Sequence, residues 1–208
     1  LGAFAVQGLK LIVSGDANDY VGKGLSGGTI VVKPSNRASF NTQDNTIIGN
    51  TVLYGATSGK LFAAGQAGER FAVRNSGAQT VVEGCGANGC EYMTGGLAVI
   101  LGDVGHNFAA GMTGGIAFVL KGSSFSHNLN TESVVAVNNM TEYWESILKN
   151  LIEEHALETS SRWAGMLLAN WEARRNQFIQ IVPKEMIDKL EHPVFENKND
   201  HNQEVLSA

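Results

Sequence analysis

The feature that most constrains the fold is a glycine-centred repeat that returns at a nearly fixed interval along the chain. Residues 93–101 (MTGGLAVIL) match residues 112–120 (MTGGIAFVL), and an earlier copy, LSGGTIVV, occupies residues 25–32. Self-similarity with a period of about 20 residues is the sequence signature of stacked-repeat architectures. Any fold for this chain must therefore repeat one short structural unit along its length.

Two interleaved series of glycines mark the expected corners of each repeat. The first series is Gly59, Gly77, Gly95 and Gly114, and the second is Gly49, Gly68, Gly86 and Gly105. Glycine costs about 1 kcal/mol per residue in a helix interior, and the Val, Ile, Phe and Thr runs between the glycines favour a pleated surface. The repeat therefore predicts two short strands per period and excludes a helix.

The predicted fold is all-β: a right-handed parallel β-helix, or single-stranded solenoid, followed by C-terminal α-helices. Coils stacked about 4.8 Å apart need glycine at corners where φ is positive or a Cβ does not fit. The handedness follows from that of parallel crossovers, and the period gives about seven coils. The predicted structural turn glycines are Gly22, Gly24, Gly27, Gly28, Gly49, Gly59, Gly68, Gly77, Gly95, Gly96, Gly105, Gly114 and Gly115.

The β-helix is predicted to occupy residues 1–138. Its first strand is expected at residues 9–13 and its last at residues 132–137, and the polar stretch 34–45 reads as a loop or insertion.

Residues 139–195 are predicted to form a helical extension that could cap the open end of the stack and cover its strand edges. The expected elements are helices at 141–158 and 160–176, a strand at 178–182 and a short helix from 183 to about 190. His155 and His192 lie in charged helical surroundings and are expected to be solvated. Residues 196–208 are polar and predicted to be a flexible tail.

Composition restricts the partners and the compartment. The net charge of −5 offers no basic surface for nucleic acid or an anionic membrane. A membrane-spanning run of about 18 apolar residues is also absent from the sequence. Cys85 and Cys90 are the only two cysteines, and a single pair does not indicate a disulfide-stabilised fold. They are predicted to be free thiols in a reducing cytosol. These features predict a cytoplasmic protein that binds neither nucleic acid nor membrane.

One motif resembles a dinucleotide fingerprint. Gly22, Gly24 and Gly27 spell G-x-G-x-x-G, but that motif needs an apolar strand before it and a helix after it. Here a polar turn precedes the glycines and a strand-like run follows them. Corner glycines are the better interpretation, and no cofactor-binding residue is predicted.

A zinc site can be imagined from Cys85, Cys90, His106 and His127. The C-x4-C spacing is loose and no second close pair of ligands follows, so buried apolar thiols are the preferred interpretation. The chain also has no nucleophile elbow and no H-E-x-x-H helix. The sequence therefore predicts no metal ligand and no catalytic residue.

The strongest polar candidates fall at the predicted corners. They are Asp16, Asn18, Asp19, Lys23, Glu69, Arg70, Arg74, Asn75, Asn88 and Glu91. Short Asx side chains are expected to bond corner amides, and Glu69 with Arg70 can form a surface ion pair. For Arg70, Arg74 and Glu91 the preferred hypothesis is docking to another domain.

Four motifs carry a resemblance to a known family: GDANDYVGKGLSGG, GERFAVRNSGA, GCEYMTGG and GHNFAAGMTGGIAFVL. Together they resemble the C-terminal GXGXG domain of the glutamate synthase large (alpha) subunit, from Leu1 to about Lys184. The same domain type is similar to the C subunit of formylmethanofuran dehydrogenase. The resemblance implies a right-handed β-helix that packs, as a structural element, between glutaminase and FMN-barrel synthase domains.

The implied parent enzyme converts glutamine and 2-oxoglutarate into two glutamates, using FMN and a 3Fe-4S cluster. None of the parts that the family uses for this chemistry occurs in these residues, so the chain is expected to be a scaffold without a cofactor. One alternative is a stand-alone subunit that assembles with separate glutaminase and FMN subunits, and another is a formylmethanofuran dehydrogenase C-like subunit. A third is an enzyme that binds a small anion with corner residues near Arg70 and Arg74. An isolated scaffold is expected to self-associate through the face that it normally buries.

Overall fold

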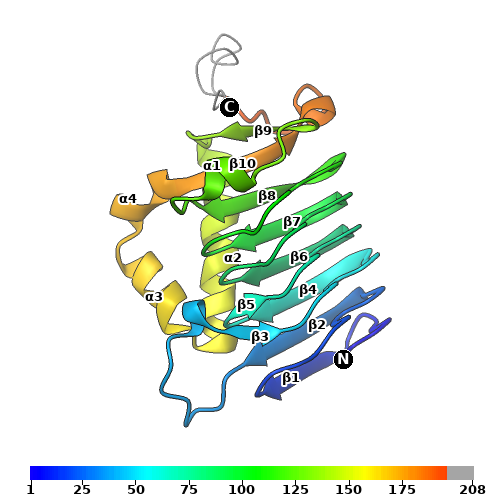
Figure 1. Ribbon diagram of the computed structural model, residues 1–208, viewed down its shortest axis with the longest axis vertical. Coiled ribbons are helices and arrows are strands. Elements are labelled where there is room, and N and C mark those ends of the chain that lie inside the picture. The colour runs from blue at the N-terminus through cyan, green and yellow to red at the C-terminus, as the bar shows by residue number, and fades with distance from the viewer. Residues whose placement is uncertain (196–208) are drawn as a thin grey trace.

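The computed structural model describes residues 1–195 and shows a β-solenoid of about six turns followed by C-terminal helices (Figure 1). Six of its strands pair in parallel, each one coil after the last. They are β1 (Lys10–Ser14), β2 (Ser26–Lys33), β4 (Ser58–Ala63), β6 (Ser76–Val82), β7 (Thr94–Ile100) and β8 (Gly114–Leu120). The predicted solenoid is confirmed.

The predicted count of about seven coils is too high. After β8 the sheet continues with β10 (Phe178–Pro183), which pairs antiparallel to β8 and also to β9 (Val134–Val137). The strand expected to close the stack, β9, therefore lies one place further out than its sequence position suggests. A strand from the C-terminal extension takes the place of a seventh parallel coil.

A second, narrower side of the solenoid consists of β3 (Thr46–Ile48) and β5 (Gln66–Ala67), which pair in parallel. Single bridges continue this side from Ala67 to Cys85 and from Cys85 to Val104. The short 3-10 helix η1 (Thr42–Asp44) lies in the predicted loop before β3. Each coil therefore has one long strand, one short extended segment and a corner between them.

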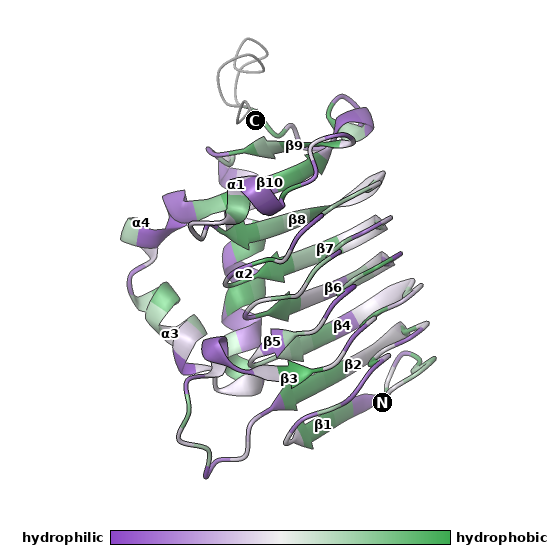
Figure 2. Cartoon of the chain, viewed as in Figure 1, coloured by the Kyte–Doolittle hydropathy of each residue, from purple (hydrophilic) through white to green (hydrophobic). Residues whose placement is uncertain are grey.

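Alternating side chains of the long strands build two apolar layers. Ile30, Leu61 and Ile100 point into the solenoid, whereas Phe62 and Phe118 belong to the layer on its outer face. This is the period-two alternation expected of a strand covered on both faces. Figure 2 shows that apolar residues follow the strands throughout the stack.

The helices that follow β9 cover the outer face of the sheet, whereas the single helical turn before β9 contributes Phe125 to the inner apolar layer. The bounds are α1 (Phe125–Asn128), α2 (Glu142–Thr159), α3 (Arg162–Ala169), α4 (Trp171–Arg174), and the 3-10 turns η2 (Arg175–Gln177) and η3 (Lys184–Met186). Helix α2 crosses β2, β4, β6 and β7, so it lies along the stack and not over its end (Figure 1). The extension does cover the open strand edge of β8, but it does so with β10 and not with a helix.

Two helix predictions need correction. The second helix, expected at 160–176, breaks at Asn170, whose backbone (φ −116°, ψ 29°) leaves the helical region between α3 and α4. The Asn170 side-chain amide donates to the Met166 carbonyl at 2.9 Å, which completes the end of α3. The helix expected from residue 183 is only the turn η3. The predicted tail, residues 196–208, lies outside the described residues.

Candidate functional site

The corners of the solenoid share an unusual backbone. Each passes through left-handed residues at alternate positions, with φ between 52° and 67°. These residues are Gly2 and Phe4; Tyr20, Gly22 and Gly24; Thr51, Leu53 and Gly55; Arg70, Ala72 and Arg74; Asn88, Cys90 and Tyr92; Asn107, Ala109 and Gly111. Left-handed φ is uncommon outside glycine, so the same costly conformation recurs from coil to coil.

Hydrogen bonds between coils explain the alternation. The Ala72 amide donates to the Val52 carbonyl of the preceding coil at 3.0 Å. The amides of Arg70 and Arg74 donate to the following coil, to Ala87 and Glu91 at 2.8 and 3.0 Å. Alternate residues therefore point their N–H groups in opposite directions along the stack, and the corner is hydrogen-bonded on both sides.

The predicted turn glycines occupy two different kinds of place. A positive φ is found at Gly22, Gly24, Gly27, Gly59, Gly96 and Gly115. The remainder, Gly28, Gly49, Gly68, Gly77, Gly95, Gly105 and Gly114, lie where an added Cβ would press on the preceding coil. At Gly68, for example, that Cβ would lie 2.9 Å from the Gly49 carbonyl carbon. Many left-handed corner residues are not glycine, and sequence reasoning missed them.

A full corner has three left-handed residues, which we call the first, second and third places in chain order, as in Arg70, Ala72 and Arg74. The three places have different surroundings. Side chains at the second place, such as Leu53 and Cys90, point inward and are fully buried. At the first place, Asn107 donates to Asn88 and receives a bond from Asn130, both at 2.9 Å. At the third place the large side chains are exposed. Tyr20, at the first place, is also 51% exposed, and its ring centroid lies 5.8 Å from Lys23 Nζ.

The three predicted docking residues lie on adjacent corners. Arg70 Nη1 lies 3.7 Å from Glu91 Oε2, and the Arg74 amide bonds the Glu91 carbonyl. The Arg70 side chain is 54% exposed and that of Glu91 only 13%, so the carboxylate is partly covered by the guanidinium. The surface pair expected between Glu69 and Arg70 is not among the ion pairs of residues 1–195; Glu91 is the partner of Arg70.

A second polar cluster joins the helices to the solenoid. One carboxylate oxygen of Glu83, which follows β6, accepts a hydrogen bond from Ser161 Oγ and lies 3.3 Å from His155 Nε2 of α2. Glu83 and His155 are fully buried, so the prediction of a solvated His155 is wrong. Both groups meet the same carboxylate oxygen, so this cluster fixes α2 and is not arranged as a Ser–His–acid relay.

Ser161 has a further local role in this cluster. Its Oγ accepts the Ala164 amide at 3.1 Å, so it caps the N-terminus of α3 while it donates to Glu83. A Ser followed by a helical run was a readable capping signal. Its pairing with a glutamate 78 residues earlier had no sequence signal.

The two thiols face the interior of the solenoid. Burial raises the pKa of Cys85 to about 12 and raises the pKa of Cys90 well above its ordinary value. Both thiols therefore remain protonated near neutral pH, which suppresses the nucleophilic thiolate. Within residues 1–195 no group of three metal-ligating side chains comes together, with or without His106 and His127.

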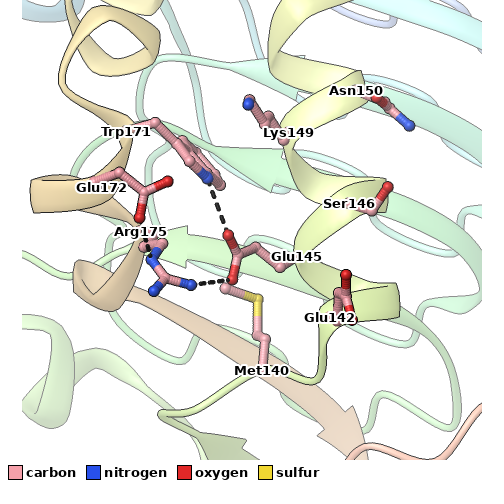
Figure 3. Close-up of a pocket in the computed structure, with 9 residues that line it drawn as sticks. All are labelled: Met140, Glu142, Glu145, Ser146, Lys149, Asn150, Trp171, Glu172 and Arg175. Atoms are coloured by element: carbon pink, nitrogen blue, oxygen red, sulfur yellow. Dashed lines mark hydrogen bonds and ion pairs between the residues drawn. The ribbon is translucent and has the colours of Figure 1, made fainter.

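A pocket of about 490 Å³ lies between the start of α2 and α4 (Figure 3). Glu145 accepts hydrogen bonds from Trp171 Nε1 at 3.0 Å and from Arg175 Nη1 at 2.8 Å. Arg175 Nε also lies 3.2 Å from Glu172. The hydrogen bond to Glu145 and the charges of both carboxylates raise the pKa of Arg175. These charges largely neutralise one another, so the pocket ties α4 to α2. Sequence reasoning did not predict this pocket.

None of the helices in residues 1–195 is long and apolar enough to cross a membrane.

Comparisons with known proteins identify relatives over nearly the whole chain. The GXGXG motif family matches residues 1–184. The "Glutamate synthase [NADPH] large chain" of Azospirillum brasilense is 66% identical over 195 residues, which is 93% of this chain and 13% of that protein. The protein of the same name in Bacillus subtilis is 51% identical, and the "Ferredoxin-dependent glutamate synthase" of Pyropia yezoensis 52%, each over 88% of this chain. The chain spans 12% of each of these two relatives.

Proposed function

The chain belongs to the GXGXG motif family, and from this premise we propose that it is the scaffold domain of a glutamate synthase large chain. In this proposal its partners are the glutaminase and FMN-barrel synthase domains of the same enzyme. FMN and the 3Fe-4S cluster belong to those parts, as does the conversion of glutamine and 2-oxoglutarate into two glutamates. The chain itself contributes shape and rigidity without chemistry.

The observation that carries the proposal is the continuity of the sheet and its bracing by α2. Within residues 1–195, one sheet of eight strands runs from β1 at one edge to β9 at the other. Lys10 of β1 and Lys60 of β4 pair with Glu158 and Glu154 of α2 at 2.8 and 2.6 Å. A rod of stacked coils braced along its length suits a part that holds neighbouring domains at fixed positions.

The proposal is tested with substitutions, made in the full large chain, that remove the charged groups of the pocket between α2 and α4. The double variant Glu145→Gln, Arg175→Gln changes the pocket of Figure 3. The variant is expected to keep kcat and KM for glutamine and 2-oxoglutarate within about twofold. A loss of tenfold or more in kcat, with the thermal unfolding of the enzyme unchanged, would contradict a purely structural role.

Deletion provides the complementary measurement. Removing these residues from the full large chain is expected to abolish coupled glutamate synthesis and to make the remaining domains dissociate or aggregate in gel filtration. Full coupled activity in a monodisperse deletion variant would show that no scaffold is needed.

A further inference from the structure

We propose that the third left-handed place of the corners is a docking strip for an acidic surface of another domain of the same large chain. The docking strip consists of Phe4, Gly24, Gly55, Arg74, Tyr92 and Gly111, one residue per coil. This inference rests on the proposed scaffold function and gives it a contact surface. The partner is identified by its chemistry: carboxylates together with a flat apolar patch.

The first observation is that large side chains are exposed at residues whose left-handed φ is energetically unfavourable. Phe4 and Tyr92 have φ values of 59° and 52° and are 65% and 57% exposed. Arg74 has φ 54° and is also exposed. Glycine holds the same place in other coils at Gly24 and Gly55, so the solenoid itself does not need a side chain there.

Most residues at the other left-handed places have burial or hydrogen bonds to offset their strain; Tyr20, which is 51% exposed, has within residues 1–195 only the nearby Lys23 ammonium, 5.8 Å from its ring centroid. Leu53 and Ala72, at the second place, are fully buried, so packing offsets their strain. Asn88 and Asn107, at the first place, bond to each other. The Arg74 side chain has no ion pair or hydrogen bond within residues 1–195. Strained residues persist where the surrounding structure or a function requires them, and for the strip residues burial among residues 1–195 does not provide the reason.

The second observation is the direction of the rings. A Cβ added to Gly24 would lie 2.5 Å from the Phe4 ring, and one added to Gly111 would lie 2.5 Å from the Tyr92 ring. Each ring therefore lies over the glycine of the next coil and along the stack. The two rings are four coils apart, and each has a cation one coil away: Lys23 for Phe4 and Arg74 for Tyr92. Tyr and Arg are residues enriched at the centres of protein interfaces.

Charge selects the chemistry of the partner. Among the strip and the residue preceding each member, the exposed charges are Lys23 and Arg74. The one carboxylate in this set, Glu91, is 13% exposed and faces Arg70. A surface with carboxylates opposite Lys23 and Arg74 is the complement. The strip is assigned to the same polypeptide because the chain spans only 12–13% of relatives that are single large chains.

A photo-cross-linker identifies the occupant directly. The full large chain carries a benzophenone amino acid in place of Tyr92, and the cross-linked peptides are sequenced by mass spectrometry after irradiation. A cross-link to a Glu- or Asp-containing segment of the same polypeptide, outside these residues, is expected. Cross-links to a second copy or to an unrelated protein, or no cross-link at all, would overturn the assignment.

Glycine variants then separate docking from folding. In the full large chain, Tyr92→Gly and Arg74→Gly install the residue that other coils already use, so unfolding of the solenoid is not expected to be accelerated. Protease cleavage between the domains is expected to be at least fivefold faster. The matched control is Ser160→Gly, another exposed left-handed residue (φ 58°) away from the strip, which should leave cleavage unchanged.

The outcomes also separate this inference from the scaffold function. Should the strip variants cleave at the wild-type rate while deletion of the whole chain abolishes glutamate synthesis, the scaffold stands and the strip is wrong. If the deletion variant keeps full activity, the scaffold function fails, and a cross-link at position 92 would still establish the contact.

Discussion

The outer face of the sheet, which the helices cover and which we call the flank, is built from the same coils as the left-handed corners. The two regions differ in how far their large side chains are buried. On the flank, Phe62 and Phe118 are fully buried beneath the helices. On the corners, Phe4 and Tyr92 remain more than half exposed despite their unfavourable φ. The C-terminal helices bury the side chains of the outer face, whereas the third left-handed place of the corners leaves large side chains exposed within the described residues.

The edge of the flank sharpens this comparison. Ile12 of β1 pairs with Val31 of β2, and Val31 pairs with Phe62 of β4. Val31 and Phe62 are fully buried, but Ile12 is 56% exposed. Helix α2 packs on β2 and β4, whereas its link to β1 is the ion pair from Glu158 to Lys10. Burial on the flank therefore ends where the helix ends, although the strand pattern continues.

The largest effect is expected from Phe62→Ala. The ring is fully buried between the sheet and α2, with its centroid 6.1 Å from that of His155. Its removal should lower the free energy of unfolding by about 3–5 kcal/mol, measured by chemical denaturation. Ile12→Ala, in the same column but exposed, is the control and should cost less than about 1 kcal/mol. Equal losses would show that α2 does not complete the flank.

The next effect compares two places of the left-handed corners by the same kind of substitution. Leu53→Gly removes a fully buried side chain and should cost about 2–5 kcal/mol. Tyr92→Gly removes an exposed one and relieves a strain of about 1–2 kcal/mol, partly offset by about 0.5–1 kcal/mol of glycine entropy. Tyr92→Gly should therefore leave the unfolding free energy, measured by chemical denaturation, equal or slightly higher. A loss as large as that of Leu53→Gly would mean that the Tyr92 ring stabilises the solenoid.

A smaller loss is expected from breaking the buried link between flank and helices. Glu83→Ala leaves His155 and Ser161 buried without their shared acceptor and should cost about 1–3 kcal/mol. The double variant with His155→Ala should lose less than the sum of the two single losses, since the residues are in contact. Strict additivity in this double-mutant cycle would refute the coupling between Glu83 and His155.

The smallest loss is expected at the surface of the same flank. Lys60 and Glu154 are 37% and 34% exposed, so Lys60→Ala should cost no more than about 1 kcal/mol. The difference from wild type should shrink further at 1 M salt, where the Debye length falls to about 3 Å. A loss as large as that of Glu83→Ala, persisting in high salt, would place this ion pair among the main determinants of stability.

Much of the fold could be predicted because its signals are local and repeated. Glycine pairs followed by apolar runs predict strands and corners, and the helical period predicts α2 to within one residue at each end. The insertion of β10 had no such signal, since a strand at 178–183 reads the same whichever neighbour it pairs with. The burial of His155 was missed because its partner, Glu83, is 72 residues away.

The candidate site was predictable in part. Arg70, Arg74 and Glu91 could be placed on the corners from the repeat period, but Tyr92 and Phe4 were not recognised. Their significance depends on φ, and a sequence signals positive φ mainly through glycine and, more weakly, asparagine, not through Tyr or Phe.

The sequence by itself determined the period, the two strands per coil and the division between repeat and helical extension, because spacing and side-chain chemistry act over a few residues. Only the tertiary structure decided the number of coils, the direction of β10 and the left-handed corners. The physical reason is that these depend on hydrogen bonds between coils. An open strand edge accepts a parallel or an antiparallel neighbour, and alternate amides such as those of Ala72 and Arg74 find their acceptors only once the neighbouring coils are in place.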